Sequence, residues 1–119
     1  MEKVTGIGGI FFRARDTGGL AQWYLDHLGV ALVPQDETGV PWMTQAGVTV
    51  FAPFAADTEY FAADKQFMIN FRVDDLAAMT AQLRGAGIEV KDLPPMEGIG
   101  KFAHLSDPEG TPIELWEPE

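Results

Sequence analysis

The stretch that decides the fold is the end of the chain, residues 100–118, which reads GKFAHLSDPEGTPIELWEP. Its centre, Asp107-Pro-Glu-Gly110, has proline and glycine at the positions that a type I turn favours. We expect strands at Gly100–Leu105 and Ile113–Trp116 on the two sides of this turn. The hairpin that results would bring His104 beside Glu114.

Upstream of this hairpin, the sequence predicts a strand followed by a helix. Residues 68–75 alternate between apolar and polar side chains, which is typical of a strand with one apolar face. Asp75 then begins a helix that presents Leu76, Met79 and Leu83 on one side and ends at residues 85–87, Gly-Ala-Gly. A further strand is predicted at Ile88–Val90, and two prolines break the chain at residues 94 and 95.

The first half repeats this order. Alternation over residues 7–16 predicts a strand, and a helix capped by Asp16 or Thr17 follows and ends at Gly29. Short strands come next, the last of them at Val48–Phe51. Residues 55–65 are richer in turn and acidic residues and are interpreted as a connector, whose two aromatic residues favour packing over free motion.

The two halves match as an internal duplication. Residues 12–16, FRARD, correspond to residues 71–75, FRVDD, and residues 48–53 correspond to residues 113–118. The sequence therefore predicts an α+β fold of two tandem βαβββ modules, at about 5–54 and about 66–118, within a single domain, 1–119. The curved mixed sheets would enclose a concave pocket, with the helices outside.

Composition excludes several classes of protein. The 119 residues are 46% hydrophobic and 22% charged, which are values of a globular chain. The net charge of −10 disfavours nucleic acid as a partner, and the absence of cysteine excludes disulfides and cysteine-bound zinc. No apolar run is long enough to span a membrane and no secretory signal is apparent, so we expect a cytoplasmic protein.

Several motifs resemble the vicinal oxygen chelate superfamily, which holds glyoxalase I, the bleomycin resistance proteins and extradiol dioxygenases. The first half carries Ala14-Arg-Asp16 and Trp23-Tyr24 with Leu28-Gly29, and the second carries Phe71-Arg-Val-Asp-Asp-Leu76 and the ending Gly100–Pro118. The resemblance spans about residues 5–118, and the ending is most similar to small bacterial glyoxalase-like proteins.

The resemblance implies four metal-ligand positions, at the first and closing strands of each half. Here they are Gly9, Thr49, Met68 and Glu114, of which only Glu114 is an ordinary metal donor. His104 adds a second donor at most. We therefore expect no cofactor and no metal, with a divalent metal as the alternative.

Strand parity predicts which residues face the concavity. They combine aromatic side chains with a few polar or charged ones, as the linings of small-molecule sites do. The predicted ligand pocket consists of Phe11, Arg13, Thr49, Phe51, Met68, Asn70, Arg72, Phe102 and Trp116, with Glu114 and His104 as candidate catalytic residues.

Structural roles remain open for the polar members. Arg13 and Arg72 occupy equivalent positions in the two halves and would either pair with Glu114 or hold a carboxylate as a fork. His104 would either hydrogen-bond to Glu114 or join it in acid/base chemistry. His27 fits packing or a dimer contact.

Two functions are consistent with these residues. One is a metal-free module that binds a small organic molecule, as in the antibiotic-sequestering proteins that the chain resembles. The other is a glyoxalase-like lyase or isomerase that uses Glu114, with or without a metal. Exposed sheet edges, together with the resemblance, also predict a homodimer.

Overall fold

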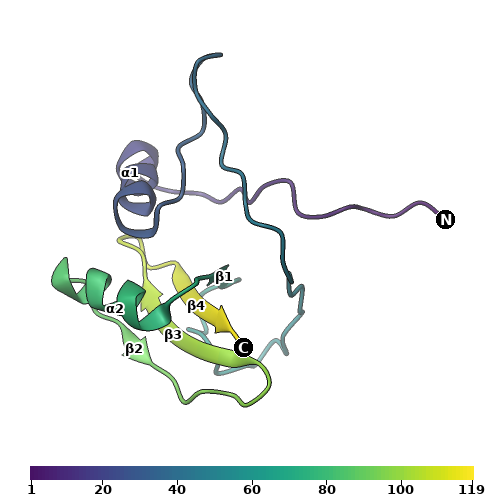
Figure 1. Cartoon of the computed structure of the whole chain (residues 1–119), viewed down its shortest axis with the longest axis vertical. Coiled ribbons are helices and arrows are strands. Elements are labelled where there is room, and N and C mark those ends of the chain that lie inside the picture. Colours follow the sequence, from purple (N-terminus) through teal and green to yellow (C-terminus); the bar gives the residue numbers. More distant parts are fainter.

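The second half of the chain forms a mixed four-stranded sheet in a computed structural model that describes residues 1–119. Its elements are β1 (Ile69–Arg72), α2 (Leu76–Gly85), β2 (Lys91–Asp92), β3 (Gly100–Ser106) and β4 (Pro112–Pro118). The strand order is β1-β4-β3-β2, with β1 parallel to β4 and the other neighbours antiparallel (Figure 1). The chain is thus an α+β fold with this sheet and two helices.

Both predicted helices are confirmed, with the predicted ends. The helix α1 (Thr17–Leu28) has Asp16 as its N-cap, whose carboxylate accepts a hydrogen bond from the Gly19 N–H at 2.9 Å. It ends at Gly29, where φ is 70°, a conformation that favours glycine. Asp75 caps α2 in the same way, accepting from the Ala78 N–H at 3.0 Å.

The core lies between the helices and one face of the sheet. The inward residues of β3 and β4 meet apolar residues from both helices, because alternate side chains of a strand point to opposite faces. Its buried members are Leu20, Tyr24, Leu76, Leu83, Val90, Ala103, Leu105, Ile113 and Leu115. The first-half helix therefore packs on the core of the second half.

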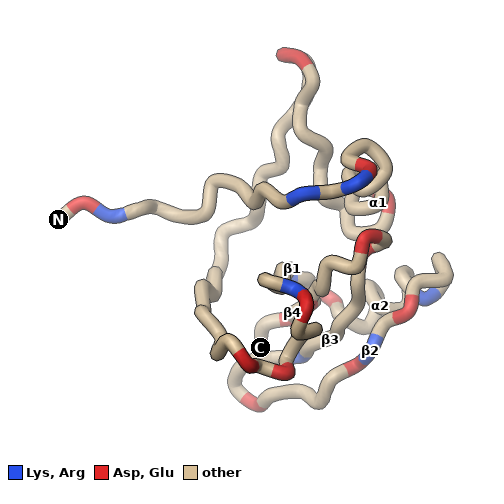
Figure 2. The backbone as a smooth tube through the Cα atoms, turned by 180° about the vertical axis from the view of Figure 1, so that it is seen from behind, with Lys and Arg blue, Asp and Glu red and all other residues tan.

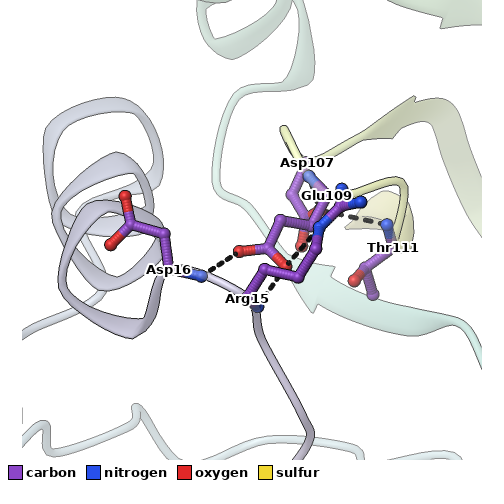
Figure 3. Close-up of polar contacts among 5 residues, drawn as sticks. All are labelled: Arg15, Asp16, Asp107, Glu109 and Thr111. Atoms are coloured by element: carbon purple, nitrogen blue, oxygen red, sulfur yellow. Dashed lines mark hydrogen bonds and ion pairs between the residues drawn. The ribbon is translucent and has the colours of Figure 1, made fainter.

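Two carboxylates of the β3–β4 turn hold α1 in this place (Figure 3). Glu109 accepts hydrogen bonds from the backbone N–H groups of Arg15, at 2.6 Å, and Asp16, at 3.0 Å. Asp107 is buried and accepts the Tyr24 hydroxyl at 2.7 Å, together with the backbone N–H groups of Glu109 and Thr111. The turn therefore connects the two strands of the hairpin and also holds the backbone directly before α1.

The strands expected in the first half are absent from the structure. Residues 7–16 and 48–51 form no backbone hydrogen bonds with a neighbouring strand, although their alternation predicts strands. Figure 1 shows two long arms: residues 1–14, the first arm, run to the N-terminus, and residues 31–54, the second arm, form a tall loop after α1. The physical reason is that a strand exists only through a paired neighbour, and neither arm has one. The strand expected at Ile88–Val90 is also displaced, to β2.

The connector packs as expected. The ring of Phe54 lies 5.5 Å from that of Tyr60 and 6.0 Å from that of Phe61.

Neither helix has both the length and the apolar character needed to cross a membrane.

Candidate functional site

A buried carboxylate, Glu114, lies at the centre of the sheet face opposite the core. It belongs to β4 and is 7% exposed. The strand register places Asn70 of β1 and His104 of β3 directly beside it. Because residues opposite one another across strands share a face, these three side chains form one polar row.

Three side chains donate or share protons with this carboxylate. The Asn70 amide donates to Oε1 at 2.7 Å, His104 Nε2 lies 2.8 Å from Oε2, and the Tyr60 hydroxyl also donates to Oε2. Both carboxylate oxygens thus have partners, which offsets the cost of burying a charge. Burial raises the pKa of the Tyr60 phenol, and its hydrogen bond to Glu114 raises it further. Tyr60 therefore stays a proton donor at neutral pH.

A second row, next to the first, is aromatic. Trp116 of β4 lies opposite Phe102 of β3 and Arg72 of β1. The two rings are nearly parallel, at 3°, with their centroids 6.2 Å apart. The Trp116 indole N–H donates to the Ile99 carbonyl at 3.0 Å, which fixes the ring. The two rows together present a carboxylate, an imidazole and two flat apolar rings on one face.

The two arginines of the predicted fork are not joined. Arg72 donates to the Gln45 carbonyl at 2.8 Å, so it contacts the second arm. The guanidinium lies against Gly47, where an added Cβ would make the end of the Arg72 side chain shift. Arg13 is exposed and has neither a hydrogen bond nor an ion pair in the structure.

The other predicted residues divide by the half to which they belong. Met68 is half-buried and lies directly before β1, near the row of Asn70. Phe11, Thr49 and Phe51 lie on the arms and are exposed, at 96% for Phe11 and 85% for Phe51. The structure therefore brings the second-half residues together and leaves the first-half residues in solvent. Their role in binding stays a prediction.

Sequence reasoning missed Tyr60 as a member of the site. The sequence predicts only packing for this residue, which lies in the connector 54 residues before Glu114. An aromatic residue within an acidic, turn-rich segment indicates that its ring is buried, but it does not indicate which residue the ring or the hydroxyl contacts. Its ring also contacts His104, with centroids 5.1 Å apart.

The remaining histidine packs on its own helix, α1, and its role in a dimer contact stays a prediction. His27 is half-buried at the end of α1, with its ring 5.4 Å from that of Trp23, and its carbonyl accepts from the Gln82 amide at 3.3 Å. Tyr24 is buried in the core, and Trp23 packs against it.

The residues present do not fit a metal ion. Gly9 has no side chain, Thr49 is a neutral hydroxyl and Met68 is a soft thioether. No three side chains of the histidine, cysteine, aspartate and glutamate types come together anywhere in the structure. A divalent ion on a soluble protein usually takes three or more such ligands.

One of three comparisons with known proteins gives a family for this chain. A family model for the glyoxalase-like domain matches residues 9–116. Among solved structures, the chain is similar to TnmS3, an antibiotic-binding protein from Streptomyces sp. CB03234, with 26% identity, a TM-score of 0.53, and coverage of 87% of this chain and 88% of that one.

Two further structures share the fold. A bleomycin resistance determinant encoded on the transposon Tn5 is 23% identical, with a TM-score of 0.56 and coverage of 89% and 92%. Lactoylglutathione lyase from Agrobacterium tumefaciens is 18% identical, with a TM-score of 0.63 and coverage of 98% and 96%. A search of curated proteins finds no match.

Proposed function

Because the chain belongs to the family of glyoxalase-like domains, we propose that it binds a small organic molecule over the Glu114 face of the sheet, without a metal ion. The observation that carries this proposal is a buried carboxylate held by Asn70, His104 and Tyr60 beside two parallel aromatic rings. A core position would be filled by apolar residues at lower cost. Polar heads among flat apolar walls are the usual composition of a ligand site.

The surroundings favour a planar, amphiphilic ligand that bears a carboxylate. The half-buried Phe102 ring offers flat apolar surface to a ring system, and the Trp116 ring, 8% exposed, supports it from the neighbouring strand. Arg72 stands in the aromatic row, and its guanidinium can hold an oxyanion by charge-assisted hydrogen bonds. The similarity to an antibiotic-binding protein supports a small organic ligand.

Binding can be tested with 1-naphthoate, a planar aromatic carboxylate, and with 1-naphthylmethanol as its uncharged counterpart. We expect naphthoate to quench the fluorescence of Trp116 and to bind more tightly than the alcohol. Arg72→Met should weaken naphthoate binding by about 1.5–3 kcal/mol and leave the alcohol unaffected, because only the carboxylate makes the charge-assisted bond.

The matched control is Arg84→Met. Arg84 lies on α2 and pairs with Asp92 at 3.2 Å, so its loss should not change the affinity for either compound. Equal effects of the two arginine substitutions, or quenching that survives Trp116→Phe, would contradict the proposed site.

A second candidate is a lyase or isomerase of the glyoxalase type. The contact that favours it is His104 Nε2 at 2.8 Å from Glu114, a pair that can hold and move a proton. The direct test supplies glutathione and methylglyoxal, whose hemithioacetal is the species that such an enzyme isomerises, in the presence of a chelator and measures the formation of lactoylglutathione. Turnover that is lost in Glu114→Gln would establish the enzyme, and absence of turnover would favour the binding protein.

A further inference from the structure

The connector, residues 55–65, reaches the Glu114 face of the sheet through one side chain, that of Tyr60. The Tyr60 hydroxyl donates to Oε2 of Glu114, and its ring stands edge-on to the ring of His104, at 89° and with centroids 5.1 Å apart. The phenol therefore lies over the polar row, on the side away from the core. A ligand that is to contact Oε2 has to share it with Tyr60 or replace Tyr60 there.

This phenol makes the only hydrogen bond between the connector and the rest of the chain. The backbone hydrogen bonds of the connector close turns within it, and its ion pair joins two neighbouring residues, Asp64 and Lys65. Upstream, residues 38–56 contain no charged side chain, and Figure 2 shows this part of the tube free of red and blue, so no ion pair holds that side. A segment with so few tertiary contacts opens locally at low cost.

A second tyrosine–carboxylate pair in the chain has a different setting. Tyr24 and Asp107 are 6% and 5% exposed, Tyr24 belongs to α1, and its ring is part of the core. Tyr60 is 41% exposed and belongs to no helix or strand. Separation of the first pair would open the core, whereas separation of the second moves only the connector. The Tyr60 hydrogen bond is therefore the one that a ligand can replace.

The replacement has to be a hydrogen-bond donor. Glu114 is buried, and a buried carboxylate that loses a donor without compensation is destabilised. A hydroxyl or N–H group of the ligand would restore the hydrogen bond to Oε2. An ether oxygen has no proton to donate, and a carboxylate at this position would face the like charge of Glu114.

The carboxylate of the proposed ligand belongs to the neighbouring row. Arg72 lies two residues beyond Asn70 along β1, which corresponds to roughly 6.6 Å. Phe102, in the row of Arg72, offers its ring to the body of the ligand. A donor and a carboxylate on opposite sides of one aromatic ring match this arrangement of Glu114 and Arg72.

We infer that the Tyr60 phenol occupies the position of a ligand's own donor on Glu114, so that the site selects planar aromatic carboxylates that carry a hydroxyl or N–H group across the ring. The donor replaces the phenol at Oε2, and the carboxylate is held by Arg72. The connector moves aside, since Tyr60 is its only polar contact with the sheet. This inference rests on the proposed function and adds to it the chemical class of the ligand.

The ligand class is tested by calorimetric titration with 1-naphthoate, 4-hydroxy-1-naphthoate and 4-methoxy-1-naphthoate. The hydroxyl and the methoxy group lie across the ring from the carboxylate, and only the hydroxyl can donate. We expect the hydroxy compound to bind at least about tenfold more tightly than the methoxy compound, because a hydrogen bond to a charged group is formed only by the first. Equal affinities of these two compounds would overturn the inference.

Tyr60→Phe tests the competition, since it removes the hydroxyl and keeps the ring. The affinity for 4-hydroxy-1-naphthoate should rise about fivefold, because the ligand no longer has to replace a bound phenol. Tyr24→Phe is the matched control, since it removes the hydroxyl of the core pair and should leave this affinity unchanged. An unchanged or weaker affinity in Tyr60→Phe would show that the phenol does not compete with the ligand, and would overturn the inference.

The same titrations separate this inference from the proposed function. Binding of 1-naphthoate that depends on Arg72, without discrimination between the hydroxy and methoxy compounds, would retain the proposed function and reject the role of Tyr60. Absence of binding by all three compounds would reject both.

Discussion

The two halves of this chain carry the same sequence pattern and reach different structures. The second half forms a four-stranded sheet and α2 around one core, whereas the first half forms α1 and two unpaired arms. Residues 12–16 and 48–53, which match residues 71–75 and 113–118, belong to no strand. Helices appear in both halves because their hydrogen bonds are local. The comparison shows that alternation gives a segment the capacity to be a strand, and a neighbouring edge decides whether it becomes one.

The largest expected effect compares a matched pair of positions in the two halves. Leu115 is completely buried in β4, and its counterpart in the first half, Val50, is 67% exposed. We expect Leu115→Ala to cost about 2–5 kcal/mol of unfolding free energy. Val50→Ala should change it by less than about 0.5 kcal/mol at concentrations where the chain is monomeric.

Urea unfolding at several protein concentrations measures both substitutions. If the homodimer predicted from the sequence buries the arms, the cost of Val50→Ala should grow with protein concentration. A large and concentration-independent cost would show that Val50 already lies in a core of its own chain.

The second effect concerns the attachment between the halves. Asp107→Ala removes the acceptor of the Tyr24 hydroxyl and of two backbone N–H groups, so we expect a loss of about 3 kcal/mol. Hydrogen exchange should rise through α1 more than through α2. The control is Asp36→Ala, which removes a similar turn acceptor from the exposed arm and should leave stability near that of the wild type. Equal protection of both helices in Asp107→Ala would contradict the attachment.

The third effect is the pH dependence of the free energy of unfolding, which also arises where the two halves meet, at Tyr24 and Asp107. Burial raises the pKa of the Tyr24 phenol far above 10.0, and the Asp107 carboxylate raises it further. In the unfolded chain this phenol ionises near pH 10, while in the folded chain it stays protonated. Its contribution to stability is therefore complete below pH 10 and lost as pH rises above it, at up to about 1.4 kcal/mol per pH unit.

Urea unfolding between pH 8 and pH 11 measures this slope. Tyr24→Phe should reduce the loss of unfolding free energy per pH unit. Tyr60→Phe should leave the contribution of Tyr24 to this loss unchanged. An unchanged slope in Tyr24→Phe would show that the phenol does not control the pH dependence.

The smallest expected effect concerns the metal-ligand positions that the family resemblance implies in the two halves. Because Gly9, Thr49 and Met68 are poor ligands, a chelator should leave the melting temperature unchanged. Elemental analysis should find far less than one zinc, nickel or manganese ion per chain. One equivalent of metal that disappears in Glu114→Gln would restore the metal-dependent enzyme.

Much of the second half was predictable from its sequence. Asp75, residues 85–87 and the Asp107–Gly110 turn set element ends through short-range chemistry, and parity placed Asn70, His104 and Glu114 on one face. The sequence predicts this polar row because side chains alternate regularly between the two faces of a strand. In contrast, no local rule links Tyr60 to Glu114, since that contact depends on how the connector folds over the sheet.

The sequence by itself determined the helix ends, the turn, the alternation of the strands and the chemical types available to the site. Each of these follows from interactions within a few residues, such as the capping of α1 by Asp16 or the positive φ of Gly29. Only the tertiary structure decided that α1 packs on the core of the other half, that Tyr60 completes the carboxylate cluster and that the arms stay unpaired. Those outcomes depend on which surfaces meet in space, and strand pairing in particular requires a second edge that alternation alone does not supply.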